Sequence, residues 1–168
     1  QIIAKMNALV EPGVIAALYA ASAAGVRIEL IVRGVCALRP GVKGLSENIR
    51  VISVVGRFLE HSRIWYFHDD GAQTLYLSSA DWMDRNLFRR VEVGFPVLDS
   101  KLKTRVLKEG LRPYLTDDSQ AWLMTADGSY HRRSSRNKLG KSAQQLLLTT
   151  LSTSTTSSPA TGKPRKAK

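Results

Sequence analysis

Cysteine is almost absent from this sequence, since Cys36 is the only one among 168 residues. An internal disulfide is therefore excluded, as is usual in a reducing cytosol, and we expect Cys36 to be a small buried hydrophobe rather than a reactive thiol. No Cys and His spacing indicates a zinc site, and there is no Walker-type glycine loop. The longest apolar run is too short and too interrupted to span a bilayer. We expect a cytoplasmic protein without a membrane span, and association with a membrane surface stays open.

The first residues also lack the basic-then-apolar pattern of a signal peptide. The chain begins with Gln1 rather than Met, and its first residues already have the character of a structured segment. We therefore expect a fragment of a longer polypeptide. A hydrophobic content of 43% is that of a globular protein, and the length suits one domain with a hydrophobic core.

The net charge of +11 is distributed unevenly along the chain. Seven of the 25 basic residues and none of the 14 acidic ones lie from Ser134 onward, which leaves 18 basic and 14 acidic residues, a net +4, before it. The basic character is therefore largely a property of the carboxyl-terminal segment. It does not by itself indicate a DNA-binding domain.

That carboxyl-terminal segment has the composition of a disordered tail. Residues 152–158 are all serine or threonine, and the chain ends in Gly-Lys-Pro-Arg-Lys-Ala-Lys. Such a sequence buries too little apolar surface to order itself. We predict one domain over residues 1–133 and a basic, Ser/Thr-rich tail over residues 134–168. Three leucines at 146–148 indicate a short helix over residues 141–151 within the tail.

The pattern of the domain predicts two helices and five strands. The first helix runs from Pro12 to Ala24 and is apolar nearly all round, so it should be well buried. The second covers residues 99–109 and is opened by an aspartate cap. β-branched and aromatic runs predict strands over residues 26–32, 48–55, 61–67, 74–79 and 89–97, with a loop over 38–44 and a hairpin turn at 69–71. This order predicts an α/β fold, a mixed sheet flanked by helices.

The residues around His61 indicate a site for phosphate chemistry. His61 and Arg63 are two residues apart in a β-type run, so we expect both side chains on one face of the sheet. The next predicted strand ends in Ser-Ser-Ala-Asp, at residues 78–81. An imidazole, a guanidinium, hydroxyls and a carboxylate close together suit phosphate chemistry, where an anionic substrate must be positioned and neutralised.

Four long motifs carry a family resemblance: residues 3–10 (IAKMNALV), 31–41 (IVRGVCALRPG), 56–63 (GRFLEHSR) and 77–86 (LSSADWMDRN). Together with the closing DGSYHRR at 127–133, they closely resemble the C-terminal domain of bacterial polyphosphate kinases, the type that phosphorylates itself on histidine. The resemblance covers residues 1–133 and leaves the tail outside.

The resemblance implies the second of two tandem phospholipase D-like domains. In the family, ATP binds in a tunnel between the two, and its terminal phosphate moves to a histidine and then to polyphosphate, so that ATP and polyphosphate(n) give ADP and polyphosphate(n+1). The phosphorylated histidine, the Mg²⁺ ligands and an adenine-contacting aromatic residue belong to the first domain. We therefore expect this fragment to need the missing amino-terminal part, to be inactive alone, and to be part of a homo-oligomer at full length.

The resemblance also assigns site residues. Arg33 and His61 correspond to ATP-binding positions, and Arg57 and Arg90 to further phosphate-facing positions on weaker grounds. Arg33 directly follows a predicted strand, where α/β folds place ligands, and a guanidinium grips two phosphate oxygens. An imidazole can donate a hydrogen bond or a proton to a phosphoryl oxygen, so His61 is the candidate catalytic residue. Since neighbours in a strand face opposite ways, only one of Arg89 and Arg90 is expected to face the site, and the resemblance selects Arg90.

Less specific roles stay open for several residues. Arg33 could instead form a strand-end salt bridge with Glu29 or Glu60, and Arg63 could be solvated. Asp81 is expected to orient His61 or an arginine, because a carboxylate beside phosphates would repel them. Core packing is expected of Trp65 and Trp82, and solvent exposure of His68 and His131.

Two other functions are alternatives to that of a polyphosphate kinase. A phospholipase D-like phosphodiesterase or nuclease half would use His-x-Lys, but Arg63 stands at the lysine position, and the two are not interchangeable. A polyanion-binding module would act through the basic tail, with weak and salt-sensitive affinity. The tail would attract polyphosphate and nucleic acid alike.

Overall fold

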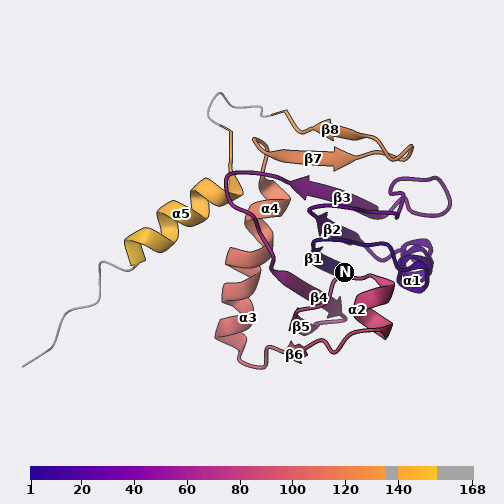
Figure 1. The fold of residues 1–168 in the computed structure, drawn as a ribbon, viewed down its shortest axis with the longest axis horizontal. Coiled ribbons are helices and arrows are strands. Elements are labelled where there is room, and N and C mark those ends of the chain that lie inside the picture. The colour runs from indigo at the N-terminus through magenta and orange to yellow at the C-terminus, as the bar shows by residue number, and fades with distance from the viewer. Residues whose placement is uncertain (135–139, 155–168) are drawn as a thin grey trace, which may run out of the picture.

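The structure, a computed structural model, describes residues 1–134 and 140–154. One eight-stranded sheet has the order β6-β5-β4-β1-β2-β3-β7-β8 (Figure 1). The predicted α/β class, a mixed sheet flanked by helices, is confirmed. The strands are β1 Ile2–Met6, β2 Ile28–Val32, β3 Ile49–Val54, β4 Arg63–Asp69, β5 Ala72–Ser78, β6 Gly94–Pro96, β7 Ala121–Met124 and β8 Tyr130–Arg132. The helical segments are α1 Pro12–Ala23, α2 Asp84–Phe88, α3 Ser100–Val106, the π-helical turn η1 Leu107–Leu111, α4 Arg112–Thr116 and α5 Ala143–Ser154.

Three parallel strands form the centre of the sheet. β1 pairs in parallel with β2, and β2 with β3, while β4 to β8 pair antiparallel with their neighbours. β2 and β3 are buried along almost their whole length, because helices cover both faces, as is usual for parallel strands.

The two faces of the sheet have separate cores. Ile3, Ile31 and Ile52 pack with Leu111 and Tyr114, whereas residues one position along the same strands pack in a second cluster with Leu18 of α1 and Trp82. The alternation follows from the two-residue period of a strand. Figure 1 accordingly shows α1 and α2 on one side of the sheet and α3 and α4 on the other.

α1 begins as predicted but is less buried than predicted. Glu11 caps it by accepting hydrogen bonds from the Gly13 and Val14 amides, and Gly25 follows its end with φ of +86°. Within α1 only Leu18 and Ser22 are buried. The expectation of all-round burial is wrong because the remaining apolar positions are largely alanine, which is a strong helix former that does not need burial.

Strand prediction has three corrections. β1, at the centre of the sheet, was not among the predicted strands, and neither were β7 and β8. The strand predicted over 61–67 begins only at Arg63. Of the range 89–97, only Gly94–Pro96 is a strand, at the sheet edge; the β-branched residues before it belong to an exposed connection from α2, where Val91 and Val93 face solvent.

Other predicted elements are confirmed. The turn at 69–71 joins β4 to β5 with positive φ at Asp70 and Gly71, as a tight hairpin requires. Asp99 caps α3 by accepting from the Leu102 amide. The short helix predicted over 141–151 is α5, and residues 135–139 and 155–168 of the predicted tail lie outside the described residues. No helix in the described part of the chain is long and apolar enough to cross a membrane.

Candidate functional site

One edge of the sheet gathers all the predicted site residues. The carboxyl ends of the parallel strands β2 and β3 lead to Arg33 and to the segment that holds Arg57. β4 is antiparallel to β1, so its amino end, preceded by His61, lies at this same edge. β5 ends there too, and Arg90 lies in the connection from β5 through α2 to β6. This carboxyl edge is where open α/β sheets bind ligands.

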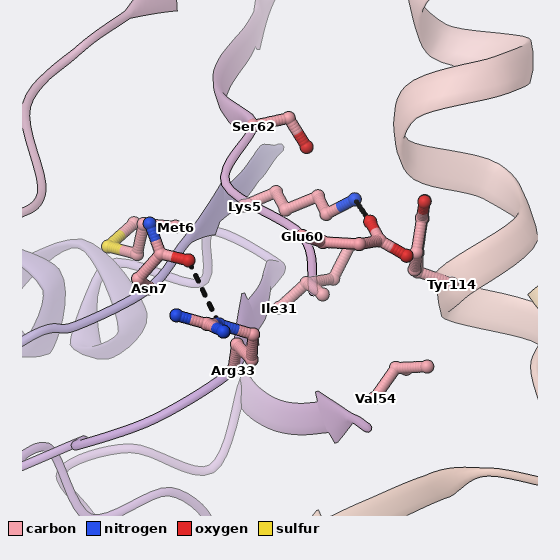
Figure 2. A pocket seen from close by; sticks show the side chains of 9 residues that line it. All are labelled: Lys5, Met6, Asn7, Ile31, Arg33, Val54, Glu60, Ser62 and Tyr114. Carbon is pink, nitrogen blue, oxygen red and sulfur yellow. Dashed lines mark hydrogen bonds and ion pairs between the residues drawn. The ribbon is translucent and has the colours of Figure 1, made fainter. Parts of the chain in front are cut away.

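A small cavity opens at this edge. Its volume is about 10 Å³, roughly the space that one water molecule needs. This cavity is therefore too small to hold a nucleotide. The cavity is lined by Lys5, Met6, Asn7, Ile31, Arg33, Val54, Glu60, Ser62 and Tyr114 (Figure 2).

Arg33 is oriented by an asparagine rather than by a carboxylate. Its Nε donates to Asn7 Oδ1 at 3.0 Å (Figure 2). The backbone of Asn7 is itself fixed. Its backbone N–H donates to Asp81 Oδ1 at 2.7 Å, and its backbone carbonyl accepts from the Gly34 N–H at 2.9 Å. Within the described residues, the terminal nitrogens of Arg33 have no hydrogen-bond partner. The guanidinium is thus positioned and keeps the donors that grip an anion.

The alternative of a strand-end salt bridge for Arg33 is wrong. Glu29 pairs with Arg50, at 2.5 Å between Oε1 and Nη2. Glu60 pairs with Lys5, at 2.5 Å between Oε2 and Nζ. Both carboxylates that could neutralise Arg33 are therefore occupied by other cations.

Lys5 is a site residue that the sequence prediction missed. It is a buried lysine in β1, with Nζ 3.2 Å from the centroid of the Tyr114 ring. Burial lowers its pKa, while Glu60 acts against that shift. Burial would raise the pKa of Glu60, but hydrogen bonds from Lys5, Tyr114 and Gln144, and the Lys5 charge, hold it below its ordinary value. A lysine inside the apolar run Ile-Ala-Lys-Met was the available signal, because a buried lysine needs a partner.

Asp81 orients Arg63, one of the roles expected of it. The contacts are Nε to Oδ1 at 3.2 Å and Nη2 to Oδ2 at 3.1 Å. Burial would raise the pKa of Asp81, but hydrogen bonds from Arg63 and the Asn7 amide and the Arg63 charge hold it below its ordinary value. The alternative that Arg63 is simply solvated is wrong, since its side chain is only 19% exposed. Arg63 is therefore not free to act as the lysine of a phospholipase D-like hydrolase.

His61 and Arg57 lie in the segment between β3 and β4, and both are exposed. Because β4 begins at Arg63, the strand alternation that placed His61 and Arg63 on one face does not apply. Instead, the Arg63 Nη1 donates to the His61 carbonyl at 2.8 Å, which fixes the backbone of the histidine. Arg57 lies over the Phe58 ring, 5.4 Å from its centroid. Neither side chain lines the small cavity, although Glu60 and Ser62 from the same segment do.

Arg90 lies outside regular structure, after α2, and is exposed. The argument that strand neighbours face opposite ways is wrong for Arg89 and Arg90, since neither is in a strand; Arg89 ends α2 and pairs with Asp84 at 2.6 Å. Near Arg90, hydrogen bonds from Ser79 and Asn86 lower the pKa of Glu92, and the charges of Arg90 and Arg63 add to this. Arg90 is therefore at the predicted edge but not in the lining of the cavity.

The remaining predictions concern packing. Trp65 and Trp82 contact each other with ring centroids 5.7 Å apart, and His68 and His131 are exposed.

Cys36 is half-buried, and burial raises the pKa of its thiol to about 11, which keeps it unreactive at neutral pH. Among residues 1–134 and 140–154, no group of three or more His, Cys, Asp or Glu side chains could hold a metal ion.

The fold and this edge define a class: a mixed α/β domain whose cationic side chains converge at the carboxyl edge of a parallel core. The sequence matches the family described as "Polyphosphate kinase C-terminal domain 2" over residues 1–145. The chain belongs to this family.

Relatives and a solved structure agree. The chain is 70% identical to a polyphosphate kinase of Burkholderia ambifaria over 133 residues, 79% of this chain and 19% of that protein. It is 63% identical to one from Paraburkholderia phytofirmans over 148 residues, 88% of this chain and 21% of that protein. The crystal structure of polyphosphate kinase from Porphyromonas gingivalis matches with a TM-score of 0.86 and 39% identity, covering 94% of this chain and 24% of that one. The chain thus spans only a minor part of these proteins.

Proposed function

We propose that this chain is the second phospholipase D-like domain of a polyphosphate kinase and supplies part of its ATP and phosphate site. In the whole enzyme, ATP and polyphosphate(n) give ADP and polyphosphate(n+1) through a phosphohistidine that lies outside this chain. The observation that carries the proposal is Arg33, which Asn7 holds at the carboxyl edge of the sheet with its terminal nitrogens unpartnered in the described part of the chain.

Each site residue has a distinct role in this proposal. Arg33 grips oxygens of the nucleotide phosphates, and Arg57 and Arg90 add positive charge at the same edge. His61 donates a hydrogen bond or a proton to a phosphoryl oxygen during transfer. Phosphoryl transfer depends mainly on positioning and on charge around the equatorial oxygens, so this half of the site needs no nucleophile of its own.

The size of the cavity supports a site shared with another part of the enzyme. A space of about 10 Å³ is far smaller than a nucleotide. ATP would therefore lie between this edge and the domain that precedes it in the longer polypeptide. The chain alone should bind ATP weakly and make no polyphosphate.

The remaining features of the enzyme lie beyond this chain in the proposal. In this proposal, Mg²⁺ is held by residues outside this chain. We further propose that the enzyme is a cytoplasmic homo-oligomer.

Calorimetric titration of ATP into the chain tests the proposal. The Arg33→Ala, His61→Ala double variant should lose at least about tenfold in affinity, because hydrogen bonds from a charged donor are lost. Arg27→Ala is a matched control, since Arg27 is exposed and precedes β2, at the opposite edge of the sheet. Equal ATP affinity in the double variant and in the control would contradict the assignment of these residues.

A further inference from the structure

The segment between β3 and β4 carries Arg57 and His61 but lacks the backbone hydrogen bonds of a helix or strand. Residues 55–62 form no helix or strand, and Val55, Phe58 and Leu59 are exposed. Among the described residues, no backbone-to-backbone hydrogen bond involves this segment. Its position must therefore be set by side chains from elsewhere in the chain.

Gln144, in the first turn of α5, supplies such contacts. Its Oε1 accepts from the Phe58 amide at 2.9 Å, and its Nε2 donates to the Phe58 carbonyl at 2.8 Å. The same Nε2 donates to Glu60 Oε1 at 2.9 Å. Gln144 is only 6% exposed, so its carboxamide is largely shielded from water. One carboxamide thus satisfies both backbone groups of Phe58, as a neighbouring strand would.

Gly56 shows that this contact is closely fitted. A Cβ added at Gly56 would lie 2.4 Å from the Oε1 atoms of both Gln144 and Gln120. Any larger residue at position 56 would displace the segment or these two side chains. A methyl group at position 56 would therefore disturb the contact between Gln144 and the segment.

The amino-terminus of α5 is itself fixed to the domain. The fully buried Asp117 accepts from the Ala143 amide, the first of α5, at 2.7 Å through Oδ2. Its Oδ1 accepts from the Ser119, Gln120 and Ala121 amides. A carboxylate at a helix amino-terminus caps free amides and interacts favourably with the helix dipole. Gln144 is therefore held on a rigid base, one residue beyond this cap.

We propose that α5 is a positioning element of the phosphate site: Gln144 holds the Phe58 backbone and thereby places Arg57 and His61 for phosphate. The inference rests on the proposed function for its phosphate part. Gln144 acts through the segment and does not touch the phosphate itself.

The test compares Gln144→Met, which keeps the side-chain length and loses the hydrogen bonds, with Gln145→Met at the exposed neighbouring position. Amide hydrogen exchange and tripolyphosphate affinity are measured on the full chain. Exchange of the Phe58 amide should rise about tenfold in Gln144→Met, since a shielded hydrogen bond is lost, and affinity should fall several-fold. Gln145→Met should match the parent in both.

A second variant reaches the same contact from the other side. Gly56→Ala leaves α5 intact and should likewise raise exchange at Phe58 and weaken tripolyphosphate binding. If exchange at Phe58 is unchanged in both Gln144→Met and Gly56→Ala, the inference is overturned. It is also overturned if exchange rises but affinity is retained while Arg33→Ala weakens binding.

Failure of the proposed function has a different signature. In that case the parent chain does not bind tripolyphosphate, or Arg33→Ala binds as well as the parent. The phosphate part of the inference then fails with it, and exchange at Phe58 still decides whether Gln144 anchors the segment.

Discussion

At the scale of residues, the cations of the candidate site differ in their partners, which are carboxylates for some and a neutral carboxamide for another. Arg63 is paired with the Asp81 carboxylate and Lys5 with that of Glu60, so both are neutralised within the fold. The Arg33 guanidinium donates a hydrogen bond only to the neutral carboxamide of Asn7 among the described residues. This difference separates the arginine available to an anionic ligand from the cations that hold the site together.

Asp81→Asn should destabilise the chain by about 3 kcal/mol at pH 7, because it leaves Arg63 without its counter-charge in a mostly buried site. The folded pKa of Asp81 is depressed, so its stabilising contribution is present above the unfolded pKa of about 3.9 and lost as pH falls through the folded value. The difference in unfolding free energy between parent and variant should therefore shrink toward pH 2. Urea unfolding at several pH values measures it.

Asp84→Asn provides the control for this substitution. Asp84 pairs with Arg89 at 2.6 Å, but the two side chains are 58% and 75% exposed. Such a surface pair is worth less than about 1 kcal/mol. Equal losses of stability in Asp81→Asn and Asp84→Asn would show that the pair of Arg63 with Asp81 stabilises the fold no more than a surface pair.

At the scale of elements, composition predicted the central strands β2 and β3, the hairpin of β4 and β5, and helices α1, α3 and α5. It did not show β1, whose apolar run is interrupted by Lys5. A buried lysine is accepted there because Glu60 and Tyr114, distant in sequence, meet its ammonium group. β-branched residues in the exposed run before β6 predict a strand, whereas pairing with β5 involves only three residues.

The helical segment from α3 to α4 packs closely on β4 at Gly110. A Cβ there would lie 2.4 Å from Cδ1 of Ile64. Gly110→Ala should therefore destabilise the chain by about 2 kcal/mol through overpacking, although alanine is the better helix former. Chemical denaturation measures the loss.

Ile64→Val removes the obstructing Cδ1 atom and should rescue part of that loss. Alone, it should cost about 1 kcal/mol. In the double variant, the two losses should be clearly less than additive. Strict additivity would mean that Gly110 is not needed for the approach of the helix to β4.

At the scale of the whole molecule, the sheet topology brings the candidate site residues together, which the local sequence pattern did not show. Arg33, Arg57, His61 and Arg90 were selected by resemblance, and the parallel and antiparallel pairings place all four at one edge of the sheet. The roles of Asn7 and Gln144 depend on contacts across 26 and 86 positions of sequence, respectively. Neither hydrophobic periodicity nor local propensity records such contacts, so these residues could not be found from composition.

The part of the polyphosphate kinases that this chain matches is small, 19% of the Burkholderia ambifaria protein. The cavity at the carboxyl edge, about 10 Å³, is much smaller than a nucleotide, which supports the proposal of a site shared with another domain. We therefore predict a strong effect of Arg33 substitution in a complete enzyme and only weak ATP binding by the chain alone.

The most direct measurement is the rate of polyphosphate synthesis from ATP by a complete polyphosphate kinase that contains this domain, with Arg33→Ala beside Arg27→Ala. We predict that kcat/KM for ATP falls about a hundredfold in Arg33→Ala, as for other preorganised donors to a developing charge, and does not fall in Arg27→Ala. Unchanged synthesis by Arg33→Ala would contradict the placement of the phosphate site at this edge of the sheet.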